Sequence, residues 1–374
     1  MINRAYNLND YIKPNKVIVI YGPRRVGKTT LLNEFLLQTQ TKYKLDSGDN
    51  IRIQEIISSQ DFRKILEYAS GYDLIALDEA QNIPNVGMGL KIIVDQIPGI
   101  MLIATGSSSF DLAGAVGEPL TGRKATLTLY PFSQQELLSL YNRYELREKL
   151  EEFIIFGSYP EVVTAATRKE KIAILEEIVN SYLLKDILTL ERIKGAKAAL
   201  DLLKLVAFQT GSQVSLNELA GQVKLDVKTV DRYLDLFEKS FIIKRLGGFS
   251  RNLRKEITSK AKYYFLDNGI RNAVVSQFNP LNSRNDAGIL WENFIVMERM
   301  KKYAYEGLYG SFYFWRTYDG QEVDLVEERE GRLSGIEFSW SGKRRKKAPK
   351  DWLKTYTNAD YTVINRDNYL DFIL

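Results

Sequence analysis

Cysteine and histidine are both missing from the 374-residue sequence. The lack of cysteine excludes disulfides, thiolate zinc sites and cysteine nucleophiles, and the lack of histidine removes the usual base at neutral pH. Any acid–base or metal chemistry must therefore use carboxylates, lysines and hydroxyl groups. No apolar run is long enough to span a bilayer, and the first ten residues contain no signal-peptide core. We therefore expect a cytoplasmic protein that has no membrane partner.

Charge and apolar content are ordinary for a soluble globular protein. Hydrophobic residues make up 45% of the chain and charged residues 26%, and the length allows more than one core, so that we expect two to four domains. The net charge of +5 is mildly basic. This charge permits a nucleic-acid partner without requiring one, because local clustering of basic residues matters more than their sum.

The most informative stretch is a glycine-bounded loop near the beginning of the chain. An apolar segment, 17–21, precedes it, and a helical pattern follows it. Four residues separate Gly22 from Gly27, Lys28 and Thr29, which is the spacing of a phosphate-binding loop between a strand and a helix. Such glycines allow backbone N–H groups to turn toward a polyphosphate, and the helix N-terminus adds its positive dipole end. The stretch therefore predicts nucleotide binding.

Two residues of this loop have specific predicted roles. Lys28 is expected to hold the β- and γ-phosphates of ATP, and Thr29 is expected to ligate Mg²⁺. The loop residues predicted to contact the nucleotide are Gly22, Pro23, Arg24, Arg25, Val26, Gly27, Lys28, Thr29 and Thr30.

A second pattern is an apolar strand, 72–77, that ends in two carboxylates, Asp78 and Glu79. Carboxylates at this position lie at the carboxyl edge of a parallel sheet, where open α/β sheets bind their ligands. Asp78 would organise Mg²⁺, and Glu79 would polarise the attacking water. Because the chain has no histidine, a carboxylate base is what ATP hydrolysis would need.

Hydroxyl side chains and an arginine complete the predicted ATPase site. Thr105 and Ser107 follow the apolar strand 100–104 and could sense the γ-phosphate, although hydroxyls are equally good turn formers. Arg123 precedes the strand 125–129 and could reach the γ-phosphate of a neighbouring subunit, which would give it a catalytic role in a homo-oligomer. The alternative is a surface arginine paired to a carboxylate.

Five motifs occur in an order that resembles a large family of prokaryotic AAA+-like P-loop ATPases. They are Gly22–Thr30, Leu77–Gln81, Ala104–Ser107, Leu120–Arg123 and Leu129–Ser133. The resemblance extends over almost the whole chain. It implies that Lys28 and Thr29 form the Walker A pair, that Asp78 and Glu79 form the Walker B pair, and that Arg123 is a candidate arginine finger.

We predict an α/β fold with four parts. A P-loop NTPase (AAA+-like) core covers residues 1–132, a helical lid 133–195, a winged helix-turn-helix 196–275, and a small α+β domain that resembles the PD-(D/E)xK restriction-endonuclease-like fold 276–374. A lid beside the nucleotide could couple ATP turnover to movement of the later parts.

The winged helix is predicted from two helices followed by two strands. If it binds DNA, Lys228, Thr229 and Arg232 on the second helix face the groove, and Arg251, Arg254 and Lys255 between the strands contact phosphates. Acidic residues on the same helix weaken this interpretation. Docking of a protein partner therefore remains an equal alternative.

The last part carries the acidic pair of a nuclease-like fold without its lysine. Asp324 and Glu337 are expected on adjacent strands, with Glu292 as a third carboxylate on the preceding helix. Such enzymes use the carboxylates to hold Mg²⁺ and a lysine two residues beyond the second acid to support the nucleophilic water. Ser339 stands at that position and carries no positive charge. We therefore expect a binding fold in which nuclease activity is lost.

The densest basic run follows this pattern and contains Lys343, Arg344 and Arg345. It is either a solvated loop or a polyanion contact whose affinity falls with salt. The leading hypothesis is a Mg²⁺-dependent ATPase whose nucleotide state moves C-terminal modules that act on DNA or RNA. A nucleotide-switched signalling or scaffold protein is the alternative, and a metal-dependent nuclease is the third hypothesis.

Overall fold

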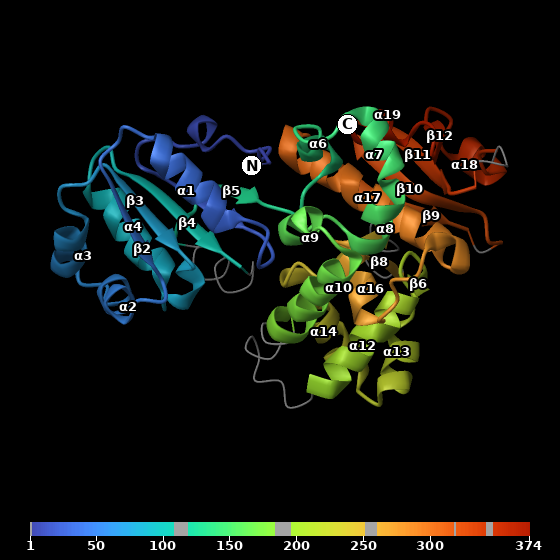
Figure 1. Cartoon of the computed structure of the whole chain (residues 1–374), viewed down its shortest axis with the longest axis horizontal. Helices are drawn as coiled ribbons and strands as arrows, with labels where there is room; N and C mark the ends of the chain where they lie inside the picture. The colour runs from blue at the N-terminus through green and yellow to red at the C-terminus, as the bar shows by residue number, and fades with distance from the viewer. Residues whose placement is uncertain (1, 108–118, 184–195, 251–259, 318, 342–346) are drawn as a thin grey trace. The chain divides into compact units, whose positions relative to one another are not determined.

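The computed structural model describes residues 2–107, 119–183, 196–250, 260–317, 319–341 and 347–374 (Figure 1). They form two compact units. The N-terminal unit comprises Arg4–Pro131 with Lys239–Phe241, and the C-terminal unit comprises Met1–Asn3, Phe132–Glu238 and Ile242–Leu374. Within the described ranges, no helix is long and apolar enough to cross a membrane.

A parallel five-stranded sheet forms the centre of the N-terminal unit, in the order β2-β3-β4-β1-β5. The strands are β1 (Lys16–Tyr21), β2 (Tyr43–Ser47), β3 (Leu74–Asp78), β4 (Met101–Gly106) and β5 (Lys124–Thr128). Because β1, β3 and β4 run in the same direction, their carboxyl ends meet at one edge of the sheet. This edge therefore receives the residues that follow each of the three strands.

Helices cover both faces of this sheet. They are α1 (Lys28–Gln38), α2 (Ile51–Ser58), α3 (Phe62–Ala69) and α4 (Val86–Gln96), with short 3₁₀ turns η1 (Leu8–Asp10) and η2 (Ala80–Asn82). Val17 and Val19 of β1 join a buried cluster with α2, α3 and α4. Ile18 and Ile20 point to the opposite face because side chains alternate along a strand, and that face receives α1, whose Leu32 is fully buried.

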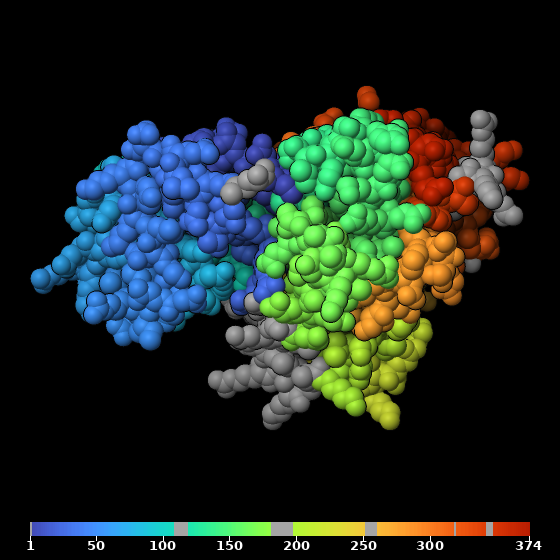
Figure 2. All heavy atoms as spheres, viewed as in Figure 1, coloured from blue at the N-terminus to red at the C-terminus, as the bar shows by residue number. Residues whose placement is uncertain are grey.

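The C-terminal unit begins with short helices. They are α6 (Gln134–Leu137), α7 (Arg143–Glu148), α8 (Leu150–Phe156), α9 (Pro160–Thr164) and α10 (Arg168–Glu177), followed by a π-helix, η3 (Ile178–Leu183). The green atoms of this region form much of one face of the C-terminal unit (Figure 2). Capping boxes at Ser133, Asn142 and Thr167 start α6, α7 and α10, because each cap side chain accepts a hydrogen bond from a free N–H of the first turn.

The later part of this unit contains further helices. They are α12 (Ala196–Phe208), α13 (Leu216–Val223), α14 (Val227–Lys239), α16 (Asn268–Val274), the 3₁₀ turn η4 (Leu281–Ser283), α17 (Ala287–Glu306), α18 (Lys350–Thr355) and α19 (Tyr369–Ile373).

A seven-stranded mixed sheet runs through the C-terminal unit in the order β12-β11-β10-β9-β7-β8-β6. Its strands are β6 (Gln213–Val214), β7 (Ile243–Gly248), β8 (Ala261–Phe265), β9 (Ser311–Arg316), β10 (Glu322–Arg329), β11 (Arg332–Ser339) and β12 (Asp360–Asn365). Strands β7 and β9 pair in parallel over Gly247–Gly248 and Tyr313–Phe314. The sheet is therefore continuous across the predicted boundary between residues 275 and 276.

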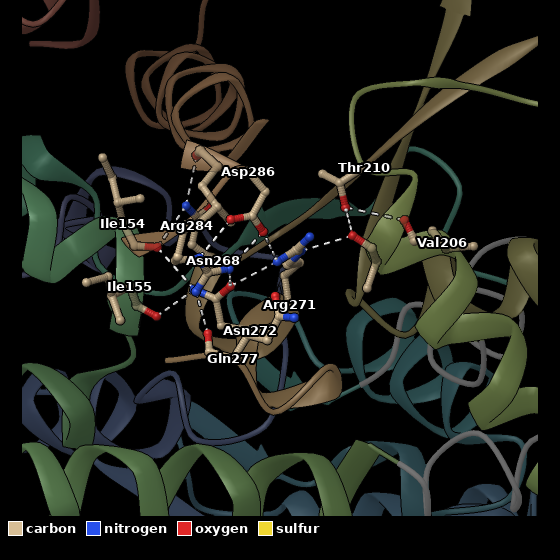
Figure 3. A network of polar contacts seen from close by, with 12 residues as sticks. Ile154, Ile155, Val206, Thr210, Asn268, Arg271, Asn272, Gln277, Arg284 and Asp286 are labelled. Carbon is tan, nitrogen blue, oxygen red and sulfur yellow. Dashed lines mark hydrogen bonds and ion pairs between the residues drawn. The ribbon is translucent and has the colours of Figure 1, made fainter. Parts of the chain in front are cut away.

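A buried polar network joins α8 to α16 and to the start of α17 (Figure 3). Asn272 donates through Nδ2 to the carbonyl of Ile155 at 2.8 Å, and Arg271 donates through Nη1 to Asp286 at 2.7 Å. Arg284 also contacts Asp286 through two parallel hydrogen bonds. Burial raises the pKa of the Asp286 carboxyl, but the two guanidinium groups outweigh burial and hold this pKa below its usual range. The network therefore fixes α8, one helix of the predicted lid, to α16 and the start of α17.

Candidate nucleotide-binding site

The loop between β1 and α1 depends on its two glycines. A Cβ atom at Gly22 would lie 2.1 Å from the carbonyl oxygen of Leu129, so only glycine fits there. Gly27 has a φ of 91° and is the N-cap of α1, where it offers no side-chain hydrogen bond to the first turn. Backbone N–H groups at the start of a helix form a binding site for an anion.

Lys28 lies inside this loop. Its side chain is buried, and Nζ donates to the carbonyls of Gly22 at 2.9 Å and Pro23 at 2.8 Å. An ammonium group held at the mouth of the loop is positioned to turn its donors toward phosphate oxygens. Of the other loop residues, Val26 is buried, Arg24 and Arg25 are half-buried, and Thr30 is exposed.

Three oxygen-bearing side chains meet beside the loop. The hydroxyl of Thr29 donates to Oδ2 of Asp78 at 2.8 Å, and the hydroxyl of Thr105 donates to Oδ1 of the same carboxylate. They come from α1, β3 and β4, which converge at the carboxyl edge of the sheet. One carboxylate and one hydroxyl are a donor set that fits Mg²⁺, because this ion takes few protein ligands and completes its shell with phosphate oxygens and water.

Glu79 follows Asp78 in a left-handed conformation, with φ of 50°. Its backbone N–H donates to the Thr105 hydroxyl at 3.1 Å, which fixes the turn after β3. Nε2 of Gln81 donates to Oε2 of Glu79 at 2.5 Å and to the hydroxyl of Ser107 at 3.3 Å. The structure thus brings together Asp78, Glu79, Thr105 and Ser107, which were predicted at this edge. It adds Gln81, which lies in the Leu77–Gln81 motif but had no predicted role.

Gly48 supports the same turn from β2, and sequence reasoning missed it. A Cβ atom at Gly48 would lie 2.2 Å from the carbonyl oxygen of Glu79, and the Gly48 N–H donates to the Asp78 carbonyl at 2.7 Å. The signal in the sequence is a glycine directly after the residues that form β2.

Arg123 lies at the other edge of the sheet from the Lys28 loop. Its carbonyl accepts a hydrogen bond from Val17 at the start of β1, and its guanidinium pairs with Asp95 of α4 at 2.6 Å. A surface arginine paired to a carboxylate was the alternative interpretation of Arg123, and the Arg123–Asp95 pair is of this kind. Because of this position, a catalytic role for Arg123 requires a second copy of the chain.

The predicted DNA-contacting helix is α14. Lys228 and Arg232 are exposed, whereas the Thr229 hydroxyl donates to Asp226, the residue before the helix, at 2.6 Å. The other predicted nucleic-acid contacts, Arg251, Arg254, Lys255, Lys343, Arg344 and Arg345, lie outside the described residues.

A buried lysine lies within the predicted nuclease-like site. Lys262 of β8 has Nζ 2.6 Å from Glu322 and 3.5 Å from Glu292. Burial lowers the pKa of Lys262, but Glu292, Asp324 and Glu322 outweigh it, so that the pKa is raised overall. Tyr264, on the same face of β8, donates to Oε1 of Glu292 at 2.7 Å. In the sequence, the signal for this cluster is a lysine, Lys262, inside an otherwise apolar strand.

The two strand carboxylates, Asp324 and Glu337, lie on the paired strands β10 and β11, as predicted. Asp324 accepts a hydrogen bond from the Phe338 N–H at 2.8 Å, and Glu337 contacts the hydroxyl of Tyr361. Burial, then Glu337 and Asp324, raise the pKa of Tyr361. Ser339 is buried at the end of β11. Across the described residues, no group of three or more acidic side chains could hold a metal ion.

Three family models match successive parts of the chain. Residues 14–138 match a family described as an AAA domain, residues 147–281 match a domain of unknown function (DUF8612), and residues 287–371 match a second one (DUF4143).

Three similar proteins from other organisms are uncharacterised. One from Mycobacterium tuberculosis is 27% identical over 327 residues, which cover 86% of this chain and 70% of the relative. One from Methanocaldococcus jannaschii is 27% identical over 325 residues, covering 81% and 70%, and one from Haemophilus influenzae is 24% identical over 353 residues, covering 88% and 83%.

Two solved structures show remote similarity. A Signal Transduction ATPase with Numerous Domains (STAND) protein from Pyrococcus horikoshii aligns with a TM-score of 0.29 and 14% identity, covering 79% of this chain and 44% of that one. The replication initiator DnaA, bound to AMPPCP and single-stranded DNA, aligns with a TM-score of 0.27 and 16% identity, covering 60% and 82%. Residues 14–138, which match the AAA domain family, contain the Lys28 loop together with Asp78 and Glu79, and the two later regions match families of unknown function.

Proposed function

We propose that the chain binds ATP with Mg²⁺ and hydrolyses it, and that hydrolysis changes the state of the C-terminal unit. The observation that carries this proposal is the Thr29–Asp78–Thr105 arrangement beside the buried Lys28. Lys28 and the N–H groups of the loop bind the β- and γ-phosphates. Thr29 and Asp78 hold Mg²⁺, which neutralises charge on those phosphates when bound.

Glu79 is the proposed base. In hydrolysis, a water oxygen forms a bond to the γ-phosphorus, the bond from that phosphorus to the β–γ bridging oxygen breaks, and a water proton moves to the Glu79 carboxylate. Thr105 holds both Asp78 and the backbone of Glu79, so that the metal ligand and the base move as one group. Ser107, which is buried beside them, is the second hydroxyl within reach of the γ-phosphate side.

Coupling to the C-terminal unit is proposed to run along the chain after β5. Leu129 contacts the loop directly, since its N–H donates to the Tyr21 carbonyl at 2.7 Å and its carbonyl packs against Gly22. A change of loop conformation on ATP binding therefore acts on the end of β5.

The same segment is held firmly where it enters the C-terminal unit. Lys301 of α17 donates to the carbonyl of Phe132 at 3.1 Å, and Glu298 accepts from the N–H of Gln134 at 2.6 Å. The two side chains pair at 2.7 Å and are each 2% exposed. Movement at Leu129 would thus be transmitted covalently to residues that α17 holds.

A nucleotide-switched protein partner is the second candidate for what the C-terminal unit binds. A groove of about 330 Å³ runs along α14, lined by the cations Lys228, Arg232 and Arg245 and by the carboxylates of Asp231, Asp235 and Glu238. Mixed charge favours a protein surface, because a polyanion would be repelled by the three carboxylates. Action on nucleic acid stays the prediction made from the sequence.

Steady-state ATP hydrolysis with Mg²⁺ tests the proposal. Wild type should hydrolyse ATP, and Glu79→Gln should lower kcat by about 100-fold or more while ATP still binds. Lys64→Ala, which removes an exposed cation on α3, should behave as wild type. Equal rates in wild type and Glu79→Gln would refute the proposed base.

The partner is tested by adding DNA or RNA to the same assay. Stimulation that disappears in roughly 0.5 M salt and in Glu79→Gln would favour nucleic acid, because phosphate contacts weaken as the ionic strength rises. A rate that is indifferent to every polymer would favour the protein partner.

A further inference from the structure

Gln81 presents an unpaired acceptor inside the candidate hydrolysis site. Its Nε2 donates to Glu79 and to Ser107, but its Oε1 is buried and has no hydrogen-bond partner among the described residues. Because a carboxylate only accepts hydrogen bonds, the amide must turn its NH₂ group toward Glu79. The orientation of the amide is thereby fixed, and Oε1 is the atom left without a donor.

A buried acceptor without a donor destabilises the fold unless a ligand or a water supplies the donor. The two ends of one amide group are adjacent, so Oε1 of Gln81 lies beside the carboxylate that would take the proton. An attacking water has two O–H groups and one reacting oxygen. One O–H can donate to Glu79 and the other to Gln81, which leaves the oxygen lone pair directed at the phosphorus.

We propose that Gln81 orients the attacking water for ATP hydrolysis, with Oε1 accepting a hydrogen bond from the water while Nε2 holds Glu79 and Ser107 in place. The amide neither gains nor loses a proton in the reaction. The inference rests on the proposed ATPase function and deepens it. It names a residue outside the Lys28 loop and the Asp78–Glu79 pair that sets the position of the attacking water. Amide side chains orient the attacking water in other phosphoryl-transfer enzymes.

The first test compares Gln81→Ala with Asn82→Ala. Asn82 is the next residue of the same 3₁₀ turn, is exposed, and donates to Asp49 at 2.7 Å, so it controls for damage to the turn. Gln81→Ala should lower kcat by about 10- to 100-fold and leave the Kd for ADP within about two-fold. Asn82→Ala should match wild type in both quantities.

The split between kcat and nucleotide affinity provides a readout that a merely structural role would not give. Gln81→Glu keeps an oxygen acceptor but cannot donate to Glu79 and Ser107, so kcat should fall while the Kd for ADP stays within about two-fold of wild type. Ser107→Ala removes the other hydrogen bond of Nε2, and its effect on kcat should not add to that of Gln81→Ala. If Gln81→Ala does not fold, Gln81→Glu and Ser107→Ala still test the assignment.

Failure of this inference can be told apart from failure of the proposed function. If wild type hydrolyses ATP, Glu79→Gln does not, and Gln81→Ala keeps the wild-type kcat, only the role of Gln81 is overturned. A wild-type kcat in Gln81→Glu would overturn it as well. If wild type and Asn82→Ala both lack activity, the ATPase proposal itself fails.

Discussion

The ammonium nitrogen of Lys262, on β8, lies 2.6 Å from a carboxylate oxygen of Glu322, on β10, and the lysine side chain is only 2% exposed. Lys262 also faces Glu292 on α17, so one cation joins three elements of the C-terminal unit. The position where a nuclease-like pattern requires lysine is occupied by Ser339. The positive charge among these carboxylates comes from β8 instead, where it neutralises part of the acidic cluster.

Removing this charge should destabilise the C-terminal unit. Lys262→Met leaves Glu322 and Glu292 without their buried cation, and breaking such a pair costs about 3 kcal/mol of unfolding free energy. All four tryptophans, at positions 291, 315, 340 and 352, belong to this unit, so urea unfolding followed by tryptophan fluorescence reports on it. The control is Lys244→Met, because Lys244 pairs with Glu238 at the surface and should contribute less than about 1 kcal/mol. Equal effects of the two variants would contradict a buried ionic role for Lys262.

Stability of the same unit should depend on the protonation of Glu292. Burial, followed by the nearby Asp324 and Glu322, raises the pKa of Glu292 from 4.5 to about 7, against the opposing effects of Lys262 and Tyr264. The folded state therefore binds this proton more tightly than the unfolded state. The contribution of Glu292 is most favourable below pH 4.5, and it is lost as the pH rises toward 7.

The pH effect is measured as a difference between Glu292→Gln and wild type. Glutamine stays neutral, so the unfolding free energy of the variant relative to wild type should rise between pH 5 and about 7 and then level off. Glu306→Gln, at the exposed end of the same helix, should show no such slope. A flat difference for Glu292→Gln would mean that the folded protein does not retain this proton.

Gly22 should tolerate no side chain. Gly22→Ala places a Cβ atom 2.1 Å from the Leu129 carbonyl oxygen, and neither backbone atom can move without shifting the loop or the end of β5. We expect ATP affinity to fall by at least about 10-fold, because displaced N–H groups no longer converge on the phosphates. In contrast, Gly221→Ala on α13 enters open space and should leave affinity unchanged. Fluorescence titration with a labelled ATP analogue measures both, and wild-type affinity in Gly22→Ala would show that the loop does not bind phosphate as described.

Arg123 and Asp95 distinguish an arginine finger from a surface ion pair. If Arg123 completes the site of a neighbouring copy, Arg123→Ala should lower kcat by about 1,000-fold, whereas Asp95→Asn should keep the activity because it leaves the guanidinium in place. Sedimentation with ATP should then show self-association. If instead both variants hydrolyse ATP as wild type does and the mass stays that of one chain, the pair is structural, with a contribution below about 1 kcal/mol.

The nucleotide site could be predicted largely because its signals are local. The spacing of Gly22, Gly27 and Lys28 and the strand that ends in Asp78 are each contained in a few residues, and parallel strands bring such ends to one edge. Most secondary structure after residue 196 was predictable for the same reason. Helix α14 (Val227–Lys239), for example, carries the three residues that were predicted to lie on the second helix of this part.

The rest depends on pairing between distant segments. Strands β7 and β9 pair at two residue positions. The alternation of apolar and polar residues within each strand does not indicate that the two strands join one sheet. Lys262 meets Glu322 and Glu292 only after that sheet has formed. The role of Gln81 was missed because it depends on the left-handed turn at Glu79 and on an unpaired atom, and neither feature has a sequence pattern.

Calorimetric titration of ATP into wild type and Lys28→Ala, each with Mg²⁺, tests whether the Lys28 loop binds ATP. Wild type should form a one-to-one complex, and Lys28→Ala should bind at least about 100-fold more weakly, because the buried ammonium is the main charge that meets the β- and γ-phosphates. Equal affinities for the two proteins, or no binding to wild type, would contradict this prediction.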